Sequence, residues 1–158
     1  MAKYVTIIGR AEEIDIVGTA LGIPAKVDTG AYRSSIHAGD IKIVEKDGAK
    51  QLKFSILGHK NAVIKRDLAV ADFTQVNVRS SNGHEQTRYE VKLKVKLANK
   101  IFTTSFSLTD RDNNIFPVLI GRTALNRRFI VDVAKSSVKM DKLLSTFGLD
   151  EKGFGEEV

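Results

Sequence analysis

An aspartate near the start of the chain is the residue best suited to chemistry. Asp28 ends an extended run that begins at Ile23, and Thr29 and Gly30 follow it. A lone exposed carboxylate is a weak base near its usual pKa of about 3.9, but two carboxyls held side by side share a proton and become an acid and a base. A neighbouring hydroxyl that hydrogen-bonds locally and a glycine that permits close backbone approach suit such a site. The same tripeptide also forms ordinary turns after strands.

A second segment fits the same chemistry. From Phe116 the chain reads Phe-Pro-Val-Leu-Ile-Gly-Arg, an apolar run that reaches Gly121 and becomes helix-like at 123–128. An apolar strand, a glycine and a short helix, following Asp-Thr-Gly by most of a domain length, are similar to the layout of an aspartic protease half. In that layout the glycine-ended strand threads beside the loop of the aspartate. Ile120, Gly121 and Arg122 are therefore expected to be structural residues around the site.

Five ordered motifs resemble the retropepsin-like aspartic proteases, and among them a small bacterial branch often labelled "ATP-dependent zinc proteases". The motifs lie at 25–31, 34–38, 79–83, 108–112 and 116–122, so the resemblance covers nearly the whole chain. It implies a closed all-β acid-protease barrel with one short helix after Gly121. It also implies hydrolysis of peptide bonds by a water activated between two aspartates. Because the chain carries one Asp-Thr-Gly, the second aspartate, Asp28', would come from another copy in a homodimer.

The resemblance also implies roles for individual residues. Asp28, Thr29 and Gly30 form the catalytic motif, with the Thr29 hydroxyl bonding across the dimer interface. A hairpin is expected to close over the substrate, with residues 80–85 as the candidate, and a plain surface hairpin is the alternative. The expected substrate-binding residues are Ala31, Arg33, Ser80, Ser81, Asn82 and Gly83.

One position departs from the family pattern. Tyr32 stands where the bacterial branch often carries arginine, and where retroviral enzymes tend to place an acid that pairs with the arginine after the glycine. Arg122 therefore needs another partner, and Asp110 or Asp112 is the expected one.

The substrate is less closely defined. The branch is associated with ATP-grasp ligases, including ones that add glutamates to protein ends, which implies that some members trim an acidic extension. The net charge of +6, with a pI near 9.5, is compatible with an anionic partner. Arg33, Arg79 and Arg88 are expected near the cleft, and arginine forks bind carboxylates bidentately.

Other chemistries fit the residues less well. The absence of cysteine excludes disulfides, cysteine-ligated metals and a thiol nucleophile. A metalloprotease needs two histidines on one helical face, but after His84-Glu85 the second histidine position is Arg88, and His37 and His59 lie on separate expected strands. We expect no metal and no cofactor. A non-catalytic peptide- or partner-binding module on the same barrel stays open, as does, with less support, a zinc metalloprotease.

Alternating patterns predict a chain made mostly of short strands, which favours a closed or sandwiched all-β domain. Lysines at 92, 94 and 96 alternate with apolar residues, as on the solvent face of a half-buried strand rather than in a nucleic-acid-binding stripe. Asp47-Gly48 predicts a hairpin turn, and Asn82-Gly83 predicts another. The other expected strands are 4–8, 14–17, 36–38, 41–45, 51–57, 63–71, 75–79, 86–97, 101–108 and 130–133.

The length of 158 residues suits one domain. We assign 1–137 to the retropepsin-like domain and 138–158 to a C-terminal helix with an acidic tail, because apolar residues from Met140 to Phe147 follow helical spacing. No apolar run approaches the roughly 20 residues of a membrane span, and no secretory signal is visible. A cytoplasmic homodimer acting on protein or peptide, without nucleic acid or membrane partners, is the expectation.

Overall fold

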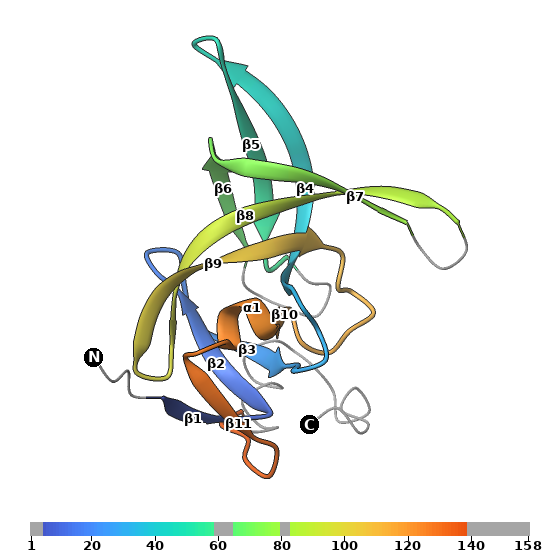
Figure 1. The fold of residues 1–158 in the computed structure, drawn as a ribbon. Helices are drawn as coiled ribbons and strands as arrows, with labels where there is room; N and C mark the ends of the chain where they lie inside the picture. The colour runs from blue at the N-terminus through green and yellow to red at the C-terminus, as the bar shows by residue number, and fades with distance from the viewer. Residues whose placement is uncertain (1–4, 59–64, 80–82, 139–158) are drawn as a thin grey trace.

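The structure, a computed structural model, describes residues 5–58, 65–79 and 83–138. These residues form eleven strands and one short helix (Figure 1), which confirms the expected all-β class. The helix predicted at 140–147 and the acidic tail lie outside the described residues. In chain order the elements are β1 (Thr6–Gly9), β2 (Ala11–Ile16), β3 (Ala20–Val27), β4 (Ser34–Lys46), β5 (Ala49–Ile56), β6 (Arg66–Val70), β7 (Phe73–Arg79), β8 (Glu85–Leu97), β9 (Lys100–Thr109), β10 (Val118–Ile120), α1 (Arg122–Leu125) and β11 (Phe129–Asp132).

Six strands close into a mixed barrel. Their order is β10-β3-β2-β8-β9-β4, and β10 also pairs with β4, which completes the ring. β10 runs parallel to β3 and β4 runs parallel to β9, while the other neighbours are antiparallel. Phe106 and Phe116 are among the largest fully buried side chains of the core. The expected closed barrel is therefore confirmed.

Strand β8 follows the predicted alternation. Val91, Leu93, Val95 and Leu97 are buried, and the lysines between them are exposed. Side chains on successive strand residues point to opposite faces, so the lysines occupy the wet face of a barrel strand.

Strand β4 is longer than predicted, because the expected strands 36–38 and 41–45 are one continuous element. The register with β5 shifts between Gly39 and Lys42, where Asp40 adopts a positive φ of 52°. A β-bulge of this kind bends a strand without ending its pairing. Gly39 and Asp40, which separate the two expected strands, therefore do not end β4. Beyond the bulge, β4 and β5 rise out of the barrel with β6 beside them (Figure 1). Their turn has positive φ at Asp47 (52°) and Gly48 (79°), as the predicted hairpin requires.

A second arm is the hairpin of β7 and β8, which pair from Phe73 with Val91 to Arg79 with Glu85. It extends sideways from the barrel (Figure 1) and matches the predicted hairpin. Residues 80–82 of its tip lie outside the described part of the chain.

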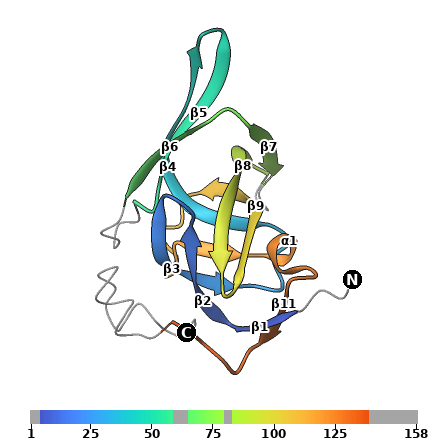
Figure 2. The ribbon, with the colours of Figure 1, turned by 90° about the vertical axis from the view of Figure 1, so that its left-hand side faces the viewer.

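Strands β1 and β11 form a separate parallel pair, in register from Thr6 with Phe129 to Gly9 with Asp132. Figure 2 shows this pair below the barrel. The strand predicted at 130–133 is thus present, but it pairs with β1 and not with the barrel. The described residues contain no helix with the length and apolar character that a membrane span requires.

Candidate active site

Asp28 lies directly after β3, at the point where the strand leaves the barrel. Its backbone N–H donates to the carbonyl of Ile120 on β10 (2.9 Å), which continues the parallel pairing of the two strands by one residue. The preceding Val27 is buried, and Asp28 itself is half-buried. The strand therefore fixes the backbone from which the carboxylate projects.

The turn after Asp28 orients its carboxylate. Gly30 N–H donates to Asp28 Oδ1 (2.8 Å), and Ala31 N–H donates to the Asp28 carbonyl (3.3 Å). One carboxylate oxygen thus accepts a backbone hydrogen bond in a local Asx-type turn. Thr29 and Gly30 are exposed, so the turn is open to solvent or to another molecule.

Gly121 supports this turn from behind, at the end of β10. A Cβ on Gly121 would stand 2.5 Å from the carbonyl oxygen of Arg33 and 2.9 Å from that of Ala31, so only glycine fits. Its N–H donates to Ser34 Oγ (3.0 Å), and Arg122 N–H donates to the Ala31 carbonyl (2.8 Å). The segment 120–122 thus packs beside the aspartate turn, and its role as structural support of a catalytic site stays a prediction. The helix that follows is shorter than predicted, because it ends at Leu125 before the positive φ of Arg127 (63°).

Arg122 differs from its expected pairing. Its Nη1 donates to the Thr29 carbonyl (3.1 Å), and its guanidinium carbon lies 5.8 Å from the centre of the Tyr32 ring. Asp110 and Asp112 instead lie beside His37. The expected salt bridge from Arg122 to one of these carboxylates is therefore wrong. Arg122 instead stabilises the aspartate turn through its hydrogen bond to the Thr29 carbonyl.

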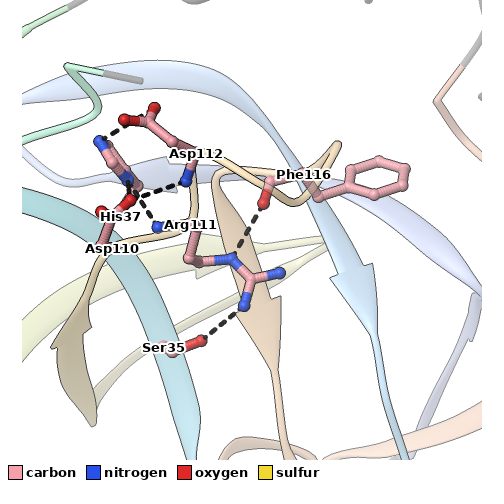
Figure 3. Close-up of polar contacts among 6 residues, drawn as sticks. All are labelled: Ser35, His37, Asp110, Arg111, Asp112 and Phe116. Atoms are coloured by element: carbon pink, nitrogen blue, oxygen red, sulfur yellow. Dashed lines mark hydrogen bonds and ion pairs between the residues drawn. The ribbon is translucent and has the colours of Figure 1, made fainter. Parts of the chain in front are cut away.

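A buried polar network links two of the sequence motifs, 34–38 and 108–112 (Figure 3). Arg111 N–H donates to His37 Nδ1 (2.8 Å), so we place the proton of the neutral imidazole on Nε2, which lies 3.8 Å from Asp112 Oδ1. The Arg111 side chain donates from Nε to the Phe116 carbonyl (2.9 Å) and from Nη1 to Ser35 Oγ (3.2 Å). His37 and Arg111 are both buried. His37 lies on β4, as its expected strand 36–38 predicts, and it is buried because it faces the loop after β9.

The network also raises the question of a metal. His37, Asp110 and Asp112 offer ligand atoms that all lie within 4.8 Å of one another. Because His37 Nδ1 already accepts the Arg111 amide, only Nε2 would be available to an ion. The other histidine motif, His84-Glu85, lies at the start of strand β8, whose first residue is Glu85. A strand does not provide the helical face that a two-histidine metalloprotease site requires.

The remaining predicted site residues fall into two groups. Ala31 and Arg33 line a pocket beside the aspartate turn, together with Arg88. Arg33 forms an ion pair with Glu90, whose hydrogen bond raises the pKa of the guanidinium. Ser80, Ser81 and Asn82 lie outside the described residues, as does the side chain of Arg79. Gly83 is described, with a positive φ of 83°.

A closed six-stranded barrel, with an Asp-Thr-Gly turn backed by a glycine-ended strand, has the architecture of a retropepsin-like protein. The chain belongs to the RimB-like family, described as "Retropepsin-like aspartic endopeptidase RimB", whose model matches residues 7–142. A solved structure of a Legionella pneumophila protein of unknown function has the same fold. Its TM-score is 0.67 at 28% identity, and the match covers 83% of this chain and 95% of that one.

Curated relatives include two proteins named "Probable alpha-L-glutamate ligase". The protein from Shewanella pealeana is 31% identical over 85% of this chain and 28% of its own length. The protein from Desulfotalea psychrophila is 32% identical over 72% of this chain and 25% of its own length. The chain thus matches about a quarter of the length of these relatives.

Proposed function

We propose that the chain is an aspartic endopeptidase in which Asp28 of two copies activates a water molecule between them. The observation that carries this proposal is the geometry of Asp28, whose half-buried carboxylate is anchored through Oδ1 to Gly30 N–H (2.8 Å) at an exposed turn. A carboxylate held in one orientation at an open surface can meet its symmetry mate across a two-fold axis. The family to which the chain belongs supports the same chemistry.

The mechanism follows from two carboxyls that share one proton. The ionised member takes a proton from water as the water oxygen attacks the peptide carbonyl carbon, and the protonated member donates its proton to the carbonyl oxygen. The aspartate that took the water proton then donates it to the departing nitrogen. As the C–N bond breaks, the other aspartate takes a proton from a hydroxyl of the tetrahedral intermediate, which yields an acid and an amine and restores the shared proton. The hydrogen bond to Oδ1 limits rotation of the Asp28 side chain. The carboxylate therefore needs little reorientation during the reaction.

The face around the aspartate turn offers an apolar surface to the second copy. An open groove of about 790 Å³ extends from Thr29 and Tyr32 to Phe129. Tyr32 in this groove is 61% exposed, and the apolar residues Leu125, Phe129 and Val131 also line it. Exposed apolar side chains that gather on one face are typical of protein–protein contacts. A copy that covers this face would bring its own Asp28 close to the first.

The substrate that we infer is an acidic, glutamate-containing protein tail. Relatives that share this domain carry the name of alpha-L-glutamate ligases, and a peptidase of the same system would act on the chains that such ligases extend. The net charge of +6 favours approach of an anionic chain. We propose that the β7–β8 hairpin, with its tip at 80–83, closes over the bound chain and excludes water.

Cleavage of acidic peptides by the purified protein tests the assignment. Asp28→Asn should lower kcat by about three orders of magnitude or more, because an amide cannot act as the base. The matched control is Asp47→Asn, the same chemical change at the distant β4–β5 turn, which should leave the rate unchanged. Sedimentation should show a dimer at working concentrations. An active monomer would contradict the shared-aspartate mechanism.

The same assay separates the proposal from its alternatives. Chelators should leave the rate unchanged, whereas a zinc enzyme would lose activity on chelation and regain it with added zinc. A non-catalytic module would bind acidic peptides without cleaving them, and Asp28→Asn would not alter its affinity.

A further inference from the structure

A small pocket lies between the aspartate turn and the β7–β8 hairpin. Its volume is about 260 Å³, below the roughly 300–1,000 Å³ typical of small-molecule sites, so it suits one side chain of a larger substrate. Ala31, three residues after Asp28, forms part of its wall, which places the pocket beside the proposed reaction centre. Its polar lining includes Ser35, Arg88, Ser107, Thr109 and Arg111.

Strand register explains why polar side chains gather there. Ser35 pairs with Ser107 across β4 and β9, and Ser107 pairs with Glu90 across β9 and β8. These three residues form a cross-strand row, and such neighbours share one face of a sheet. The residues next to them in sequence, such as Ile36 and Val91, are buried in the core on the other face. The pocket therefore has a polar floor built from barrel strands.

The pocket carries excess positive charge. It is lined by three arginines and one glutamate, and that glutamate, Glu90, is already paired with Arg33. Arg88 and Arg111 are the other two arginines of the lining. A carboxylate is the ligand that this balance of charge favours, and arginine is suited to bind it through paired hydrogen bonds.

Arg111 is held in place before any ligand arrives. Its side chain is fixed by hydrogen bonds to the Phe116 carbonyl (2.9 Å) and to Ser35 Oγ (3.2 Å), and the residue is only 7% exposed. Ser107 and Thr109 also line the pocket, and their hydroxyls share one hydrogen bond (3.3 Å), which leaves the proton of the other hydroxyl to donate to an anion. A rigid, partly desolvated group binds an opposite charge at a lower entropic cost than a mobile surface side chain.

We propose that this pocket binds the side-chain carboxylate of an acidic substrate residue next to the cleaved bond, with Arg88 and Arg111 as its specificity-determining cations. The inference rests on the proposed peptidase function. It assigns to this pocket the discrimination between a glutamate and a glutamine side chain of the substrate. Arg88 lies on the hairpin proposed as the cover, so closure would complete the pocket around the bound side chain. Glu90, by holding Arg33, limits the positive charge of the pocket.

The test is a peptide scan in which each glutamate of a cleaved acidic peptide is replaced in turn by glutamine. At the position that enters the pocket, the replacement should lower wild-type kcat/KM by about ten- to hundredfold, as expected for loss of a hydrogen-bonded charge partner. Arg88→Gln should shrink this difference, and Glu90→Gln should increase it by freeing Arg33. Lys92→Gln removes an exposed charge two residues from Glu90 on the same strand and should leave the difference unchanged. Opposite effects of neighbouring substitutions would not arise from general destabilisation.

The pocket assignment would be overturned if the wild type and Arg88→Gln showed the same difference in kcat/KM between glutamate and glutamine peptides. It would also be overturned if Lys92→Gln shrank this difference as much as Arg88→Gln does. If the wild type cleaves no peptide, the proposed function fails, and binding then decides the pocket separately. Fluorescence anisotropy with a labelled oligoglutamate peptide should show tighter binding to Asp28→Asn than to Asp28→Asn with Arg88→Gln. A labelled oligoglutamine peptide should bind both variants equally weakly. Equal affinity of the two variants for oligoglutamate would reject the pocket.

Discussion

Gly121 lies so close to Arg33 that a Cβ on the glycine would stand 2.5 Å from the Arg33 carbonyl oxygen. The contact joins the end of β10 to the segment that follows the aspartate turn. Backbone atoms cannot swing away as a flexible side chain can, so any larger residue at 121 must displace the turn itself.

Gly121→Ala should therefore destabilise the fold by about 1–3 kcal/mol, the range for overpacking of a close-packed site. It should also lower peptidase activity beyond the loss of folded protein, because the Asp28 turn moves. Urea unfolding with a parallel activity assay measures both effects. Gly39→Ala is the matched control, since a Cβ there meets nothing within 4 Å. Equal stability of the two variants would contradict the close contact.

Arg122 should affect activity more than stability. Its side chain is exposed and donates to the Thr29 carbonyl (3.1 Å) inside the catalytic motif. Arg122→Met removes this tie, and small misplacements of a reacting group cost about ten- to a hundredfold in rate. The midpoint of urea unfolding should change little. Arg66→Met, a change at another exposed arginine that donates to a main-chain carbonyl (3.2 Å, to Thr19) away from the aspartate turn, should leave kcat unaltered.

His37 should be sensitive to the position of its acceptor atom. Its Nδ1 accepts the Arg111 amide (2.8 Å) in a buried setting, and an unsatisfied buried donor costs about 1–3 kcal/mol. His37→Asn keeps an acceptor close to the position of Nδ1, whereas His37→Gln places its acceptor nearer that of Nε2. In denaturant unfolding, His37→Asn should therefore have a larger free energy of unfolding than His37→Gln. The reverse order would show that contacts of Nε2 outweigh the bond to Arg111.

The ion pair at the bulge of β4 predicts a pH dependence. Lys65 Nζ donates to Asp40 Oδ2 (3.0 Å), which lowers the pKa of Asp40 and raises that of Lys65 from their usual values of 3.8 and 10.5. A lowered carboxyl pKa contributes stability above pH 3.8 that is lost as the pH falls through the folded value. A raised lysine pKa contributes stability below pH 10.5 that is lost at higher pH.

Lys65→Gln should accordingly raise the pKa of Asp40 toward its ordinary value, as measured by NMR titration of the carboxyl carbon. Both groups are exposed, so the effect on the free energy of unfolding should be small and screened by salt. Lys53→Gln removes another cation of the same surface pocket and should shift the Asp40 pKa less. An equal shift in both variants would indicate a general charge effect rather than the specific pair.

The sequence by itself determined the class of fold and the position of the candidate catalytic aspartate. The alternation in 91–97 has a period of two that depends only on the local strand, so the buried and exposed residues of β8 were predictable. Asp47-Gly48 likewise defines its turn through the φ values that these residues tolerate. The ordered motifs around Asp28 and Gly121 led to a family that the comparison confirms.

Only the tertiary structure decided which distant residues meet. His37 and Arg111 are 74 residues apart, and no local pattern encodes the register that places β4 beside the loop after β9. The same holds for the polar row from Ser35 to Ser107, which depends on one register among several that alternation alone allows. A shift by one residue would turn every side chain of a strand to the opposite face, so closure of the whole barrel selects the register. The pocket beside Asp28 exists because that closure sets strands from three parts of the chain side by side.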